Sequence, residues 1–216
     1  MKRLMLYTAC IILFAGCAQG QVSRDFAAVP QPKAGEKLAT FGGGCFWSMS
    51  EAMSELRGVN KVISGYAGGT TKNPTYEDVS SRETGHAEVV QIYYDPNVIS
   101  YQTLVHSFFF AHDPTGLNRQ GPDMGTDYRS IAFFRTPEEK AILMDEIKKV
   151  NASKHYPDPI VTQVVPFAVF YPGEKYHQGY YRLHLDDNPY LTSVSQPKVM
   201  KFRAVMKTQL KAEFQK

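Results

Sequence analysis

The stretch Gly42-Gly43-Gly44-Cys45-Phe46-Trp47 marks the passage from a strand to a helix, and the expected fold extends outward from it. Residues 37–41 before it read as a short strand, and apolar residues after it recur at helical spacing up to Leu56. This order places Cys45 at a helix N-terminus, where unpaired N–H groups and the positive end of the helix dipole stabilise an anion. We therefore expect Cys45 to be a thiolate nucleophile of lowered pKa.

Strand-like and helix-like segments mix without strict alternation along the chain. Strands are expected at residues 37–41, 59–67, 87–94, 128–134, 160–165 and 167–171. Helices are expected at residues 46–56, 101–111, 136–151 and 198–216, and loops at 72–85 and 112–127. With 216 residues, 43% hydrophobic and 21% charged, the chain has the size and composition of one globular domain. These features predict a single α/β (α+β) domain, a two-layer sandwich with a mixed sheet.

The first 36 residues are expected to lie outside this domain. A basic start, a short apolar run and small residues lead to Cys17, which resembles a bacterial lipoprotein signal. Residues 1–16 would be removed and Cys17 lipidated; the alternative is ordinary signal cleavage near Ala18, which releases a soluble protein. Residues 17–36 read as a tether. Both readings predict a protein exported in a bacterium, and the first anchors it on the periplasmic side of the cell envelope.

The positions of the three cysteines, Cys10, Cys17 and Cys45, carry further information. Cys10 leaves with the signal and Cys17 is lipidated or removed, so Cys45 stands alone in the expected mature protein. A lone cysteine in an exported protein favours a free thiol with a chemical role over a disulfide framework. The alternative is a buried, inert cysteine, and the helix-end setting argues against it.

Glu88 and the two aromatic residues after Cys45 are the next candidates for chemistry. In the strand at 87–94, Glu88 shares a face with apolar residues, so desolvation would raise its pKa and make it a proton donor near neutrality. The alternative is a solvent-exposed glutamate at the start of the strand. Phe46 and Trp47 beside a nucleophile suit a small apolar group such as a methyl, or they belong simply to the core.

Other classes of site find little support in the sequence. It contains no Cys-x-x-Cys or His-Glu-x-x-His, so no metal site is expected, and the glycine run lacks the third glycine of a dinucleotide motif. A net charge of +3 without a basic stripe predicts no nucleic-acid partner. His86, His112 or His177 could approach Cys45, so a Cys–His hydrolase or acyl transferase stays open. A lipoprotein that only binds a methylated ligand also stays open.

A series of motifs in order along residues 37–180 resembles the A-type peptide methionine sulfoxide reductases. The motifs are Gly44-Cys45-Phe46-Trp47, Gly65-Tyr66-Ala67-Gly68-Gly69, Asn73-Pro74-Thr75-Tyr76, Thr84-Gly85-His86-Ala87-Glu88, Tyr94-Asp95-Pro96, His112-Asp113-Pro114, Asn118-Arg119-Gln120-Gly121-Pro122-Asp123, Gly125-Thr126-Asp127-Tyr128-Arg129-Ser130 and Tyr176-His177-Gln178. The resemblance implies a ferredoxin-like core in a reductase domain at 37–190. Residues 191–216 remain as a basic, helical tail that docks on the domain or touches anionic lipid.

The resemblance also implies roles for individual residues. Cys45 matches the nucleophile that reduces the S epimer of methionine sulfoxide, free or in proteins. Glu88 matches the acid that protonates the sulfoxide oxygen, and Phe46 and Trp47 match the pair that holds the S-methyl group. The other implied substrate-binding residues are Tyr76 and Tyr128, which hold the oxygen, and Asp123 at the rim of the pocket.

Two departures from the family pattern stand out. Ser48 and Ser50 occupy places where the family usually has glycine and glutamate, and no cysteine follows Cys45, whereas many relatives carry one or two resolving cysteines there. We therefore expect no bound cofactor and a Cys45 sulfenic acid that an external thiol reduces, either a thioredoxin-like protein or a small thiol. The remaining expected partners are oxidised proteins or peptides and a membrane reached through the lipid anchor; the protein is expected to be a monomer.

Overall fold

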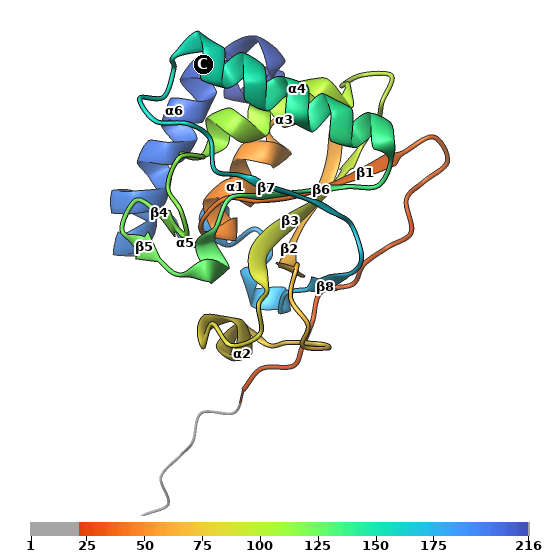
Figure 1. Ribbon diagram of the computed structural model, residues 1–216. Coiled ribbons are helices and arrows are strands. Elements are labelled where there is room, and N and C mark those ends of the chain that lie inside the picture. The colour runs from red at the N-terminus through yellow and green to blue at the C-terminus, as the bar shows by residue number, and fades with distance from the viewer. Residues whose placement is uncertain (1–21, 216) are drawn as a thin grey trace, which may run out of the picture.

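The computed structural model describes residues 22–215 (Figure 1). The expected signal and Cys17 fall within positions 1–21, outside the described residues. Across 22–215, none of the helices combines the length and apolar character needed to cross a membrane.

A six-stranded sheet in the order β7-β6-β1-β3-β2-β8 forms the centre of the protein. Its strands are β1 (Lys37–Gly42), β2 (Val59–Ala67), β3 (Ala87–Tyr94), β6 (Ile131–Phe134), β7 (Gln163–Pro166) and β8 (Phe170–Pro172). Neighbours pair antiparallel, except that β6 and β7 run parallel. The central order β6-β1-β3-β2, with one helix after β1 and one after β3, is that of a ferredoxin-like unit. The predicted mixed sheet and core are therefore confirmed.

Four helices gather on one side of the sheet in Figure 1: α1 (Phe46–Ser54), α3 (Tyr101–Ala111), α4 (Pro137–Ser153) and α6 (Gln196–Met206). The main core lies between them and the sheet, where Phe41, Phe108 and Phe202 are fully buried. A smaller apolar cluster on the other face contains Val89 and Ile131 and is covered by Val165 of β7, Phe170 of β8 and Phe167 between them. Strand β3 is buried along its whole length.

Capping side chains explain where two of the helices begin, and one of these helices was not predicted. Ser100 caps α3, as its side chain accepts a hydrogen bond from the Thr103 N–H. Residues 72–85, expected as a loop, contain the short helix α2 (Tyr76–Ser80). Thr75 and Asp78 form a reciprocal capping box there, which stabilises one helical turn within the polar segment.

The second expected loop, residues 112–127, is also more ordered than predicted. It contains a two-stranded hairpin of β4 (Arg119–Gln120) and β5 (Asp123–Met124), followed by the 3₁₀ turn Thr126–Tyr128. The hairpin lies near α5 (Tyr180–His184) and α6 in Figure 1.

The C-terminal region packs on the domain through its charged and apolar side chains. After α5 come the π-helical turn Leu191–Ser195, α6, and the 3₁₀ turns Lys207–Gln209 and Ala212–Phe214. The guanidinium of Arg203 contacts the Glu55 carboxylate at 2.6 Å, and Arg182 contacts Glu51 at 2.8 Å. The helix expected at 198–216 instead starts earlier, at Gln196, and ends at Met206.

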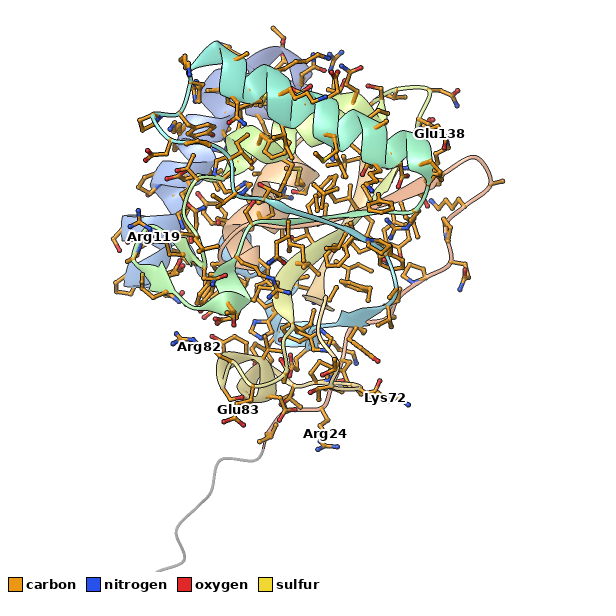
Figure 2. All side chains as sticks on the ribbon, in the orientation of Figure 1. Arg24, Lys72, Arg82, Glu83, Arg119 and Glu138 are labelled. Carbon is orange, nitrogen blue, oxygen red and sulfur yellow. The ribbon has the colours of Figure 1, made fainter. Side chains whose placement is uncertain are left out.

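The described part of the expected tether, residues 22–36, also lies along the domain. Backbone hydrogen bonds join Ala27 to Gly173 and Lys175 to Asp25, and the Tyr93 hydroxyl donates to the Pro30 carbonyl. Figure 2 shows charged side chains such as Arg24 and Glu83 pointing outward, while side chains fill the space between sheet and helices.

Candidate active site

Cys45 is the N-cap residue of α1 and is only 5% exposed. The glycines before it allow this position, because Gly44 has φ of +80° and a Cβ on Gly43 would lie 2.6 Å from the His112 ring. The run therefore lets the chain turn sharply from β1 into α1 beneath neighbouring side chains. The thiol of Cys45 is free and sits at the helix N-terminus, as predicted.

Strand β3 brings Glu88 to the same helix end. One carboxyl oxygen of Glu88 accepts a hydrogen bond from the Phe46 N–H at 2.9 Å, and the side chain is 3% exposed. Burial raises the pKa of Glu88 to about 8; the Phe46 N–H opposes this shift, and Asp127 adds to it. Glu88 is therefore mostly protonated at neutral pH, and the exposed-glutamate alternative is wrong.

A cavity of about 280 Å³ opens onto Cys45 and Glu88. Its lining residues are Cys45, Trp47, Tyr76, Glu88, Asp123, Tyr128, Asn188 and Tyr190. The structure thus brings together six of the seven site residues predicted from the sequence. Burial raises the pKa of both Tyr76 and Tyr128, so their hydroxyls stay protonated and can donate hydrogen bonds into the cavity.

Phe46 is the seventh predicted site residue, and its ring does not line this cavity. The ring is 1% exposed and packs against Tyr66 and His177, with ring centroids 5.8 and 4.8 Å away. Its backbone N–H faces the site and holds Glu88. Phe46 therefore supports the cavity wall from behind.

The prediction of a lowered pKa for Cys45 is wrong in this structure. Burial raises the pKa of the thiol above its usual range, and the nearby Glu88 carboxyl adds to the effect. The Trp47 backbone and the Tyr190 hydroxyl act in the opposite direction, lowering the pKa of the thiol, but they are outweighed. Desolvation of the thiolate is thus larger than the stabilisation offered by the helix terminus. Burial and the charge of Glu88 are the two main causes of this raised pKa, and protonation of Glu88 removes the second.

The indole of Trp47 is held by groups that the sequence analysis did not assign. Its Nε1–H donates to Nδ1 of His177 at 3.1 Å, and its ring stacks on Tyr180 at 3.9 Å. Burial lowers the pKa of His177 to about 4, so the imidazole is neutral and can accept this bond. The motif containing His177 was a signal for this role; Tyr180, Asn188 and Tyr190 gave no comparable signal.

The three histidines considered as partners of Cys45 are occupied elsewhere. His86 accepts from the Gly69 N–H and contacts the Thr71 carbonyl, whereas His112 contacts Phe108 and Ser130. None of the described residues that line the cavity is a histidine. The geometry therefore gives no support to a Cys–His hydrolase. Within residues 22–215 no group of three His, Cys, Asp or Glu side chains could hold a metal ion.

Comparison with known proteins agrees with this arrangement. A family model described as peptide methionine sulfoxide reductase matches residues 37–210. The peptide methionine sulfoxide reductase MsrA of Haloquadratum walsbyi is 52% identical over 167 residues, covering 77% of this chain and 94% of the relative. Reduced Mxr1 from Saccharomyces cerevisiae has a TM-score of 0.68 and 31% identity, covering 73% of this chain and 91% of that chain. Mxr1 in complex with Trx2 has a TM-score of 0.50 and 26% identity, covering 70% and 89%.

The raised pKa of Glu88 predicts an unusual dependence of stability on pH. With a pKa of about 8 folded and about 4.5 unfolded, the folded state binds more protons between these values, so stability falls as pH rises from about 5 to about 8. Glu88→Gln removes this loss. In urea unfolding, the free energy of unfolding of the variant should rise relative to that of the parent across this window, by on the order of 2–4 kcal/mol at pH 8.

Glu83→Gln is the matched control, since Glu83 is exposed (Figure 2) and its replacement should leave the pH dependence unchanged. Parallel stability curves for Glu88→Gln and the parent between pH 5 and 8 would show that Glu88 is ionised in the folded protein.

Proposed function

The chain belongs to the peptide methionine sulfoxide reductase family, and we propose that it reduces the S epimer of methionine sulfoxide, free or in proteins, with Cys45 as nucleophile and Glu88 as proton donor. The family resemblance of its motifs is thereby confirmed, and the chain is an enzyme of the A type. One observation carries the assignment of roles: a buried carboxyl with a pKa of about 8 and a free thiol meet at one helix end inside one cavity.

The chemistry requires both groups. A sulfoxide sulfur is a poor electrophile until its oxygen is neutralised, and a protonated Glu88 can donate to that oxygen while its other oxygen keeps the Phe46 N–H. The hydroxyls of Tyr76 and Tyr128 supply further donors for the same oxygen. The negative charge that builds on the oxygen thus meets donors already in place.

Atoms and protons balance without a cofactor. The Cys45 sulfur attacks the substrate sulfur, the oxygen is transferred to the Cys45 sulfur as its bond to the substrate sulfur breaks, and methionine leaves. The oxygen remains on Cys45 as a sulfenic acid. Over the whole step one proton passes from the Cys45 thiol to this oxygen, and Glu88, which gives up a proton first, regains one at the end.

The walls of the cavity suit a methyl sulfoxide. Trp47 lines the cavity beside Cys45 and offers an apolar surface for the S-methyl group, while Phe46 supports the wall behind it. Asp123 stands on β5 with its carboxylate partly exposed and can accept hydrogen bonds from the backbone or amino group of a substrate.

An external thiol completes the cycle in this proposal. The sequence has no cysteine after Cys45, so a first thiol would displace the hydroxyl of the sulfenic acid as water and form a mixed disulfide. A second thiol then releases reduced Cys45 and a disulfide product. A related reductase, Mxr1, is known in complex with Trx2, which supports a thioredoxin-like protein as the physiological reductant.

In this proposal the activity is located at the cell envelope. Residues 1–16 act in this proposal as a lipoprotein signal, and a lipid on Cys17 anchors the enzyme on the periplasmic side, where it repairs oxidised exported proteins.

Replacing the nucleophile tests the assignment directly. With excess dithiothreitol and an S-epimer methyl sulfoxide as substrate, Cys45→Ser should lose at least about 10³-fold in kcat, because the hydroxyl is a far weaker nucleophile than a thiolate. Glu88→Gln should lose about 10²–10⁴-fold, and lower pH should not restore it, because an amide has no acidic proton to give.

Circular dichroism of both variants serves as the control for folding. Turnover by Cys45→Ser near the parental rate would overturn the role of Cys45.

The recycling step predicts a defined oxidised state. Parent enzyme treated with substrate but no reductant should form one methionine per protein and gain the mass of one oxygen on Cys45, read by non-reducing mass spectrometry. An intramolecular disulfide in the mature protein would contradict recycling by an external thiol.

The N-terminal proposal predicts that the mature protein begins at Cys17 with lipid attached. Mass spectrometry of the N-terminal peptide from protein made in a bacterial host should show a diacylglyceryl-modified Cys17. An unmodified N-terminus beyond Cys17 would instead support ordinary signal cleavage.

A further inference from the structure

Tyr190 enters the active-site cavity from the C-terminal region, between α5 and the π-helical turn. Its side chain lines the cavity together with Cys45, and its ring packs edge-on against Trp47 with centroids 6.1 Å apart. Its hydroxyl donates to a carboxylate oxygen of Asp123 at 2.7 Å. The same hydroxyl shares the cavity with the Cys45 thiol and lowers the pKa of that thiol.

A tyrosine hydroxyl has one proton and can donate it to one acceptor at a time. In the structure this hydrogen bond goes to Asp123, so the Tyr190 hydroxyl does not donate to the Cys45 sulfur at the same time. The position between a carboxylate and a sulfur nevertheless gives the hydroxyl two acceptors within reach. The hydroxyl donates its hydrogen bond to whichever acceptor carries more negative charge and has fewer other hydrogen-bond partners.

Lys198 provides Asp123 with a second partner. Its ammonium lies 3.6 Å from the Asp123 oxygen that accepts from Tyr190. The ammonium nitrogen is buried and has no hydrogen-bond partner among the described residues. A small movement of the flexible lysine would let it donate to Asp123, so Asp123 stays paired when Tyr190 turns away.

The Cys45 sulfur needs such a donor when it becomes negative. It is buried, and the Trp47 backbone and the Tyr190 hydroxyl lower its pKa and so favour the thiolate. Titratable groups face it from several elements: Glu88 from β3, Asp123 from β5, Tyr76 from α2, Tyr128 from the 3₁₀ turn, and Tyr190 itself. Glu88 and Asp123 disfavour a negative sulfur, so a neutral hydroxyl donor opposes both.

We propose that Tyr190 is a further catalytic residue, whose hydroxyl turns from Asp123 to the Cys45 sulfur when the thiolate forms, while Lys198 takes over the Asp123 carboxylate. Tyr190 keeps its proton throughout, and only the acceptor of its hydrogen bond changes. The proposal rests on the proposed function for its place in turnover. The exchange of partners itself can be tested without substrate.

The test compares Tyr190→Phe with the parent in two assays. In the first, the rate of Cys45 alkylation by iodoacetamide is followed against pH without substrate; the midpoint should move to higher pH, with alkylation about tenfold slower at pH 7. In the second, kcat with excess dithiothreitol should fall about tenfold while KM stays within about twofold. Phenylalanine keeps the ring contact with Trp47, so the hydroxyl alone is removed.

Three further variants make the test specific. Tyr181→Phe removes a buried tyrosine hydroxyl from the same region, away from the cavity, and should leave the alkylation midpoint unchanged. Lys198→Met should shift the midpoint in the same direction as Tyr190→Phe, because the Tyr190 hydroxyl then keeps its hydrogen bond to Asp123. Lys201→Met, three positions along α6, should not.

The outcomes separate this inference from the proposed function. An alkylation profile of Tyr190→Phe that overlays that of the parent would overturn the inference, as would a loss of thermal stability with an unmoved midpoint. A shifted midpoint in an enzyme that reduces no methyl sulfoxide would support Tyr190 as the donor to Cys45 and sink the proposed function instead.

Discussion

The hydrogen bond from the Phe46 N–H to the buried Glu88 carboxyl is the contact on which the active site depends. It joins β3 to the first turn of α1. One of the unpaired N–H groups at the helix N-terminus therefore donates to a carboxyl group instead of to water. Because that acid is buried and other carboxylates lie nearby, its pKa rises to about 8. The contact therefore positions a proton donor beside Cys45, while burial keeps that donor protonated at neutral pH against the opposing effect of the Phe46 N–H.

The same contact explains why Cys45 is not a ready thiolate. A helix N-terminus stabilises an anion by roughly 0.3–1 kcal/mol at exposed sites, whereas burial penalises a charge by much more. Glu88 occupies the N–H of Phe46, so the sulfur has fewer backbone donors of its own. In this arrangement the reactivity of the thiol depends on the protonation of Glu88 and on side-chain donors in the cavity.

Local sequence patterns predicted the fold well because the main elements are defined locally. The Ser100 cap and the apolar run of β3 can be read from neighbouring residues, and both elements appear at the expected positions. Helix α2 was missed because one capping box within a polar segment decides it. The pKa of Cys45 was missed because it depends on the burial of the whole cavity, and Tyr190 because its partner Asp123 is 67 positions away. Contacts between distant segments leave no mark on either segment alone.

The position of Tyr190 depends in turn on charges at the far end of α1. Glu51 and Glu55 are buried there, and a buried carboxylate is strongly unfavourable unless a cation compensates it. Arg182 on α5 and Arg203 on α6 provide that compensation, so the elements on either side of Tyr190 are both fixed to α1. Helix α1 thus presents Cys45 at its N-terminus and, through its C-terminal carboxylates, holds in place the segment that carries Tyr190 to that cysteine. Ion pairs of Glu51 and of the C-cap residue Glu55 therefore tie the C-terminal half of α1 to the elements on either side of the residue that lines the cavity at its N-terminus.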